Sequence, residues 1–566
     1  MSNLWVAQVL GTIADLLEIQ GEEQFKAAAY RRASRAIAHS SEDLLGLARE
    51  GRLRELDGVG KSLAAKIEEI LATGSCRYLE ELALEVPLRV RELLDLPGVG
   101  PRTASRLFRE LGITGLEELE VALGNGSIER LPGLGAKRAA AIARGVAELK
   151  SARAAGHPLG QVLPWAEALR ARLAAASGVQ EVTICGAARR WRETVDVLEL
   201  VAAADPPEPL REVFQQLFAP YQVQIGAPHH LSAQGGPAGP VELRIVPPGR
   251  HVAAVHQCTG STGHLVKLRR WAERRGVQSG EGVATPDGMP PAVTGEPQLY
   301  GFLGLQYIAP ELREGRDEIE QAAAGLLPDL VEAADIRGDL HVHSNWSDGT
   351  ASLEELAAAV PGYEYLAVTD HSVSLAITGG LDARRLQEQK EAIARVNAQH
   401  PDGTRLLSGV EVDIRRDGSL DLDDQVLAGL DVVVAAIHSG LRQDRATLTS
   451  RLEQAVKNPH VDIIGHPTGR LLGGRQPDLP DLEHLLAMAA ATGTAFELNG
   501  SPERLDLNDT WARRARSHRV KLSLASDAHS LAGLKDLRYG LGMARRAGLE
   551  APDLLNSRPL GDLLRR

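Results

Sequence analysis

The pattern of hydrophobic and polar positions changes twice along the chain. Apolar positions at helical spacing, separated by Gly-rich turns, predict short amphipathic helices over residues 1–155. Short apolar runs typical of strands follow within 160–250, and 251–318 has a mixed, helix-rich pattern. After a charged helical connector, apolar strands alternate with helical stretches from 338 onward. This last pattern predicts an α/β barrel or a doubly wound sheet.

Seven apolar runs in the last third end in polar side chains suited to metal binding. The runs cover 338–344, 365–372, 406–414, 432–440, 461–467, 494–500 and 521–529. Barrel enzymes carry their chemistry at the carboxyl ends of the strands, so we expect these side chains to meet. His341 and His343 face the same side of one strand, as do Asp527 and His529, because side chains alternate along a strand.

The candidate ligands are imidazoles and carboxylates. They are His341, His343, Asp348, His371, Glu411, His438, His466, Asp527 and His529. A catalytic zinc usually takes three protein ligands, so nine predict two or three ions, with carboxylates such as Glu411 as bridges. These donors suit Zn, Mn or Fe. Such ions activate water for attack on phosphorus and stabilise the leaving oxygen. One such histidine alone would be interpreted as a satisfied strand-end residue, but nine together predict a phosphoesterase.

The motifs around these residues resemble the PHP (polymerase and histidinol phosphatase) family. The HxH…D, TDH, GxE, IHSG, GHP and SDAH elements are all present within 337–566. The resemblance implies a distorted seven-stranded barrel with a trinuclear metal centre that hydrolyses phosphoesters. It also implies that each of the nine residues is a ligand, because each motif position is filled.

Three segments in the first part repeat a Gly-x-Gly turn followed by a helix. The glycine pairs are Gly58/Gly60, Gly98/Gly100 and Gly133/Gly135, and a basic residue follows each pair closely, namely Lys61, Arg102 and Lys137. A helix N-terminus after such a turn offers free N–H groups to a phosphate oxygen. The segments, the first two above all, resemble the helix-hairpin-helix motif, which grips the DNA backbone without reading bases. The alternative to DNA binding is that these segments are purely structural turns between helices.

Lys66 lies on the helix that follows the first of these turns. Ala64-Ala65-Lys66-Ile67 resembles the AxxKI segment of the lyase domain of DNA polymerase β-like enzymes, where the lysine forms a Schiff base, and Tyr30 also fits that domain. Neighbouring cations would lower the pKa of such a lysine and activate it. A phosphate-contacting or solvated lysine is the simpler interpretation.

The middle of the chain resembles the palm and adjoining subdomain of X-family DNA polymerases. The matching elements are CGAARRWRETVDVLELV, VELRIVPP and CTGSTGHLVKLRR. The resemblance implies that Gly186, Arg190, Gly260 and Ser261 bind nucleotide phosphate. With the hairpin repeats before it and the PHP-like part after it, the order of parts resembles the bacterial PolX family.

The palm-like part departs from the family pattern at its metal carboxylates. The family has three Asp residues that hold two Mg²⁺ ions, and their positions here hold Val197, Glu199 and Glu242. Octahedral Mg²⁺ tolerates the longer Glu poorly, whereas Mn²⁺ is more forgiving. Asp196 would point away from Glu199 on a regular strand. We therefore expect polymerase activity, with Mg or Mn, to be weak or absent.

Composition and charge limit the class of protein. The 566 residues are 43% hydrophobic and 24% charged, which is ordinary for globular domains. The net charge of −12 argues against nucleic acid as a partner, but the first 160 residues carry nearly balanced charge, so DNA binding there stays open. The three Cys are scattered, and the N-terminus is a poor match to a signal peptide, so we expect a cytoplasmic protein. No apolar run is long enough to cross a bilayer, so we expect no membrane partner.

The resemblances together predict a multidomain chain. We expect a lyase-like helical domain with a helix-hairpin-helix at 1–88 and a second helix-hairpin-helix subdomain at 89–157. These are followed by a nucleotidyltransferase-type α+β palm at 158–250 and a thumb-like subdomain at 251–318. A linker at 319–336 then leads to a distorted (β/α)7 barrel at 337–566.

The predicted function is DNA repair by a monomer that binds gapped or 3′-ended duplex. Its barrel removes nucleotides from a 3′ end, and its palm binds dNTP and adds nucleotides poorly. A competent gap-filling polymerase, a non-catalytic DNA-end scaffold and a phosphatase for small phosphoesters are the alternatives. The metal identity and the repair pathway stay open.

Overall fold

The computed structural model describes the chain except for residues 1–2, 22–23, 39, 41–43, 74–75, 155, 220, 222, 227–228, 237–238, 277–292, 361, 376–377, 474–478 and 566. It forms two compact units: unit 1 comprises 1–189 and 194–303, and unit 2 comprises 190–193 and 304–566. Within the described part, no helix is long and apolar enough to cross a bilayer.

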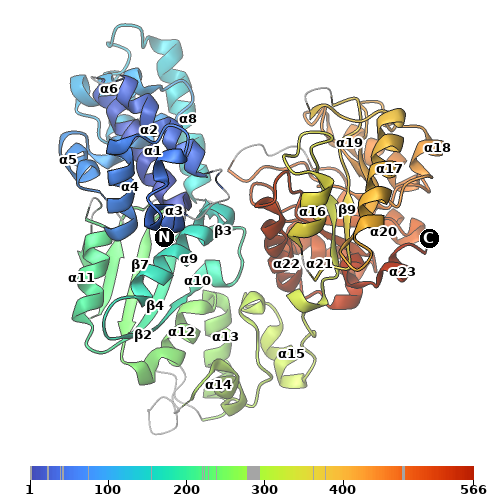
Figure 1. Cartoon of the computed structure of the whole chain (residues 1–566). Coiled ribbons are helices and arrows are strands. Elements are labelled where there is room, and N and C mark those ends of the chain that lie inside the picture. The colour runs from blue at the N-terminus through green and yellow to red at the C-terminus, as the bar shows by residue number, and fades with distance from the viewer. Residues whose placement is uncertain are drawn as a thin grey trace. The chain divides into compact units, whose positions relative to one another are not determined.

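The first part of unit 1 is helical, as its amphipathic pattern predicts (Figure 1). Its helices are Asn3–Gln20 (α1), Gln24–Ala38 (α2), Leu44–Arg49 (α3), Lys61–Thr73 (α4), Arg77–Glu85 (α5), Pro101–Leu111 (α6), Leu116–Gly124 (α7) and Ala136–Ala154 (α8). Apolar side chains at helical spacing are buried, for example Leu79 and Leu82 of α5. Helix α1 is central here, because α2, α4, α5 and α6 all pack against it.

Each of the three Gly-x-Gly turns precedes a helix, as the repeats predict. The first glycine of each pair, Gly58, Gly98 or Gly133, has a φ between 75° and 81°, which a side chain would disfavour. The second glycine lies directly before α4, α6 or α8. No side chain caps the N-terminus of α6 after Gly100, so its first N–H groups lack a side-chain acceptor.

The rest of unit 1 is built around a five-stranded mixed sheet in the order β2-β4-β7-β6-β5. The strands are Val179–Ile184 (β2), Leu198–Ala204 (β4), Val223–Ile225 (β5), His230–Ala233 (β6) and Val241–Val246 (β7). A separate pair joins His157–Pro158 (β1) to Thr194–Val195 (β3). The helices are Leu159–Ala174 (α9), Gly186–Arg189 (α10), Glu208–Leu217 (α11), His251–Thr259 (α12), Thr262–Glu273 (α13) and Glu296–Phe302 (α14). This is the α+β architecture expected of the palm-like and thumb-like parts.

Unit 2 contains the parallel seven-stranded sheet that the alternation of strands and helices predicts. The strands run in sequence order and are Gly338–Val342 (β8), Tyr365–Val368 (β9), Arg405–Asp413 (β10), Val432–Ala436 (β11), Ile463–Ile464 (β12), Ala495–Asn499 (β13) and Leu522–Ala525 (β14). The helices of unit 2 are Glu318–Ala324 (α15), which precedes the barrel, and Leu353–Ala359 (α16), Ala383–Gln399 (α17), Asp424–Leu427 (α18), Arg445–Lys457 (α19), Leu482–Thr492 (α20), Asp509–Ser517 (α21), Leu537–Arg546 (α22) and Leu560–Leu563 (α23).

The core of this barrel follows the period-two pattern of its strands. On β11, Val432 and Val434 pack in one hydrophobic cluster, while Val433 and Ala435 pack in another. Both faces of the strand are therefore buried, which explains why these strands are apolar throughout rather than alternating.

Two sets of hydrogen bonds join the edge strands β8 and β14 and nearly close the barrel. At the carboxyl ends of the strands, the His343 N–H donates to the Ala528 carbonyl at 2.9 Å, and the Asp527 N–H donates to the His341 carbonyl at 3.1 Å. Near the start of β8, the buried Asn556 amide donates to the carbonyls of Gly338 (2.8 Å) and Leu524 (2.9 Å). Its side-chain oxygen accepts from the Leu524 N–H at 2.7 Å.

We predict that Asn556→Ala destabilises unit 2, because it leaves three buried backbone groups without partners. The expected loss in the free energy of unfolding is about 2–4 kcal/mol. Urea denaturation followed by circular dichroism measures it, with Gln387→Ala on the exposed face of α17 as the control. A loss for Asn556→Ala no larger than that of the control would contradict this role.

Candidate metal centre and neighbouring sites

All nine predicted ligands meet at the carboxyl ends of the barrel strands. His341 and His343 leave β8 on the same side, as the period of a strand requires, and their Nε2 atoms lie 3.1 Å apart. Segments far apart in the chain contribute the others, because they lie on or directly after strands that are neighbours in the sheet. Two of the nine, His466 and Asp527, adopt positive φ (26° and 54°), which non-glycine residues rarely do outside functional sites.

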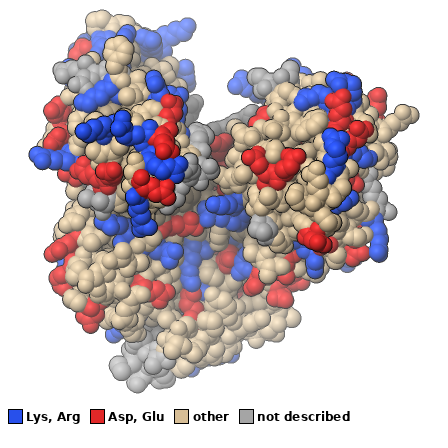
Figure 2. Space-filling view, viewed as in Figure 1, with Lys and Arg blue, Asp and Glu red and all other residues tan. Residues whose placement is uncertain are grey.

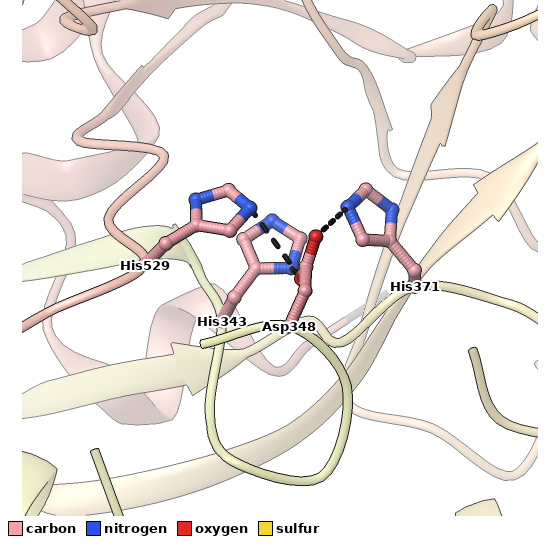
Figure 3. Close-up of side chains that lie close together, drawn as sticks. All are labelled: His343, Asp348, His371 and His529. Carbon is pink, nitrogen blue, oxygen red and sulfur yellow. Dashed lines mark ion pairs between the residues drawn. The ribbon is translucent and has the colours of Figure 1, made fainter. Parts of the chain in front are cut away.

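Three histidines surround Asp348 and form a group of four side chains with it (Figure 3). Its carboxylate lies 3.5 Å from both the His371 and the His529 ring nitrogens and 3.8 Å from His343 Nδ1. The His343 and His529 rings stack with their centroids 4.1 Å apart. The four ligand atoms lie within 4.8 Å of one another, a spacing that suits one shared ion.

Two further groups share members with the first. His341 and His343 form one group with Asp527, and His371 forms the other with Glu411 and His438. The Glu411 carboxylate is central: Nδ1 of His371 lies 2.9 Å from it, Nε2 of His438 3.0 Å and Nε2 of His466 2.9 Å. Shared ligands between adjacent groups are the arrangement of a multinuclear centre.

The electrostatics of the site show how the charges compensate one another. Burial would raise the pKa of Glu411, but the charges of His438, His371 and His341 hold it well below its usual range. Burial opposes the charge of His371 and His438, yet Glu411 raises their pKa values to about 10 and about 9. Burial lowers the pKa of His343 to about 4, so this imidazole is neutral at pH 7.

The residues fit divalent ions. Within the described part of the chain, the buried Nδ1 atoms of His343 and His466 have no hydrogen-bond partner, and the donors are the imidazole and carboxylate groups that such ions prefer. Three overlapping groups can each hold an ion, which agrees with a centre of two or three metals.

Two carboxylates that support the site were missed by sequence reasoning. Glu497 of β13 lies 2.6 Å from His341 Nδ1 and accepts a 2.5 Å hydrogen bond from the His466 N–H. Asp413 likewise lies 3.2 Å from His438 Nδ1. Carboxylates behind metal-binding histidines fix ring orientation and tautomer. An acidic residue inside an otherwise apolar strand was the signal that could have found them.

Asp370 braces the loop that carries Asp348. This fully buried carboxylate accepts hydrogen bonds from the Ser344 N–H (2.9 Å) and hydroxyl (2.5 Å), from the Ser347 hydroxyl, and from the Gln389 amide (2.5 Å). These bonds hold loop 344–348 against α17, which fixes the position of the Asp348 carboxylate.

The two glutamates predicted to occupy the polymerase carboxylate positions lie together in the sheet of unit 1. Glu199 and Glu242 are direct neighbours on β4 and β7. A side chain at Gly186 would come within 2.0 Å of the Glu199 carboxylate, so Glu199 lies against the turn predicted to bind phosphate. Asp196 lies instead against Gly156, where a side chain would meet its carboxylate at 2.5 Å. Asp196 therefore does not join the Glu pair.

The predicted nucleotide-binding residues have diverse surroundings. Gly260 precedes α13, and Ser261 caps this helix by accepting from the His264 N–H at 3.1 Å. Arg190 belongs to unit 2, where its buried guanidinium pairs with Glu314 at 3.0 Å. The ion pair therefore already engages the Nε of Arg190.

The lysine predicted for lyase chemistry lies in a small aromatic cluster. Tyr30 stacks on Tyr78 at 6.0 Å, and the Nζ atoms of Lys26 and Lys66 lie 4.6 and 5.2 Å from the Tyr78 ring centroid. Lys61 begins α4, and Arg102 lies in the first turn of α6. On the face in view, Figure 2 shows Lys and Arg interspersed with Asp and Glu over this helical region.

Comparisons with protein-family models match four parts of the chain. Residues 1–76 match a helix-hairpin-helix domain, and 90–148 match a SAM-like helix-hairpin-helix tandem. Residues 254–314 match a DNA polymerase beta thumb, and 339–501 match a PHP domain.

The relatives described next include one named as a DNA polymerase/3′-5′ exonuclease and two named as probable phosphatases. A DNA polymerase/3′-5′ exonuclease PolX of Bacillus subtilis is 36% identical, covering 99% of this chain and 98% of the relative. A probable phosphatase of Syntrophotalea carbinolica is 31% identical, covering 38% of this chain and 90% of the relative. A probable phosphatase of Thermoanaerobacter sp. is 33% identical, covering 28% of this chain and 65% of that protein.

We predict that Glu497→Gln weakens the binding of divalent metal, because a neutral amide is a weaker acceptor for Nδ1–H of His341 and no longer fixes the tautomer of this ring. The expected loss of metal affinity is about 10- to 100-fold. Competition with a chromogenic chelator measures it, and Glu503→Gln, an exposed position on the following loop, is the matched control. Equal affinities for the two variants would contradict the role of Glu497.

Proposed function

The chain belongs to the PolX family, and from this we propose that it trims 3′ ends of DNA with the metal centre of its barrel. The convergence of the nine side chains at one end of the barrel carries the proposal: eight form the overlapping groups, and His466 lies 2.9 Å from Glu411. So many buried ionisable groups would be costly in a purely structural role.

The proposal assigns the chemistry to the ions and their placement to the protein. When bound, two or three ions would activate water and neutralise charge on the phosphoester. The three overlapping groups centred on Asp348, Asp527 and Glu411 would hold them. The donor set favours Mn or Zn and also fits Fe.

DNA as the substrate is supported by the parts that accompany the barrel. The turns at Gly58–Gly60 and Gly98–Gly100 present helix N-termini next to Lys61 and Arg102. The PolX relative is named for DNA polymerase and 3′-5′ exonuclease activities, which gives the direction proposed here. The relatives named as probable phosphatases cover only 38% and 28% of this chain, so small phosphoesters are the secondary candidate.

We further propose that the palm polymerises weakly and prefers Mn²⁺. The Glu199 and Glu242 pair is not joined by a third carboxylate, and no group of three potential ligands occurs around it within the described residues. A competent gap-filling enzyme would need two Mg²⁺ ions at this place.

We also propose a reducing cytoplasm as the compartment, because the three cysteines are unpaired.

We predict that His343→Ala abolishes nuclease activity, because this imidazole belongs to two of the three groups. The expected fall in the cleavage rate is at least about 100-fold, as for the loss of a group acting in the transition state. The assay uses gapped duplex with a 3′ label and Mn²⁺ or Mg²⁺. Persistent cleavage by the variant would show that another site is responsible.

The same gapped duplex with dNTPs tests the palm. We expect extension by the wild-type protein near background with Mg²⁺ and measurable extension with Mn²⁺, because the longer Glu side chains disturb octahedral geometry. The His343→Ala protein is the suitable background here, since trimming no longer masks extension. Robust extension with Mg²⁺ would refute the proposal that the palm polymerises weakly. It would leave the assignment of nuclease activity to the barrel intact.

A further inference from the structure

Arg504 places a cation at the edge of the metal centre. It follows β13, and its Nε lies 3.6 Å from Oδ2 of Asp527. The two oxygens of this carboxylate have different surroundings. Oδ1 faces the ring nitrogens of His343 (3.3 Å) and His341 (3.7 Å), whereas Oδ2 accepts from the Asn499 amide at 3.0 Å. Arg504 therefore lies on the side of Asp527 away from the two histidines.

The backbone around Arg504 is firmly held. Its N–H donates to the Ser501 carbonyl at 2.9 Å, and its carbonyl accepts from Nε of the largely buried Arg470 at 3.0 Å. Leu505 adopts a positive φ of 46°, and the buried Asp506 carboxylate accepts from the Thr468 N–H at 2.9 Å. A loop braced in this way presents a side chain in a defined place, as binding sites require.

The guanidinium itself has few partners. It forms no hydrogen bond to any residue that the structure describes, and its distance to Asp527 is too long for one. Its side chain is only 22% exposed, although a guanidinium carries five N–H donors. The nitrogens of Arg504 are not among the buried atoms without a partner, so its N–H donors are accessible and available to a ligand that approaches the metal centre.

A phosphodiester has the chemistry to bind these accessible donors. Its non-bridging oxygens match the fork of a guanidinium, and it must approach the group formed by His341, His343 and Asp527 to be hydrolysed. We propose that Arg504 binds a non-bridging oxygen of the phosphate at the metal centre. The proposal rests on the proposed function, because it takes the barrel as the site of phosphoester hydrolysis.

The competing role for Arg504 is to hold Asp527 in place for the metal. The two roles differ in what a substitution changes. A phosphate-binding residue affects the affinity for phosphate and leaves the metal in place, whereas a residue that positions Asp527 affects the metal content.

The test compares Arg504→Met and Arg504→Lys with the wild-type protein. Two measurements are made: calorimetric titration of thymidine 5′-monophosphate into the metal-loaded protein, and metal content by mass spectrometry. We expect the Met variant to bind this nucleotide about 10- to 100-fold more weakly, with unchanged metal content and partial recovery by Lys. Uncharged thymidine should show no difference between the proteins.

Arg384→Met is the matched control, because Arg384 is exposed on α17 and pairs with Glu388. Unchanged nucleotide affinity in Arg504→Met, or a loss of metal in that variant, would overturn the proposal. Neither result depends on nuclease activity. Failure of the nuclease assignment is recognised separately, by wild-type protein that binds metal and nucleotide but does not cleave DNA.

Discussion

The structure of the barrel depends on one electrostatic constraint, the burial of many ionisable side chains at the ends of its strands. An isolated buried charge is costly, so each must be paired, bound to a cation or neutralised. Here Glu411 is surrounded by imidazoles, and Glu497 and Asp413 stand behind two of the histidines. The apolar strands, the braced loops and the closure between β8 and β14 all hold these groups within reach of one another.

The same constraint distinguishes the two sites of the chain. In the barrel, every position of the ligand pattern is filled, and the side chains converge in overlapping groups. In the palm, Glu199 and Glu242 lie side by side, but Val197 supplies no oxygen and Asp196 turns toward Gly156. Coordination of a hard cation depends on the number of oxygens and their placement, and for this reason we propose that the palm polymerises weakly.

Much of this arrangement could be predicted from sequence because it depends on local rules. The period of a strand places His341 beside His343, and apolar runs with polar ends predict a barrel with its chemistry at one end. The Gly-x-Gly turns and their helices follow from the backbone freedom of glycine.

What escaped prediction depends on contacts between distant segments. Nothing local in the sequence indicates that Asn556 closes the barrel at Gly338 and Leu524, or that Arg504 lies beside Asp527. The ion pair of Arg190 with Glu314 likewise joins residues that are 124 positions apart. Side-chain partners of this kind are set by the fold, so only the structure shows them.

Anomalous X-ray diffraction from crystals of the metal-loaded protein, recorded at the Mn and Zn edges, tests the central claim most directly. We expect two or three anomalous peaks, each within about 2.0–2.3 Å of donor atoms from the nine side chains and with Glu411 bound to an ion. Density without such peaks, in crystals of protein that cleaves DNA, would contradict it.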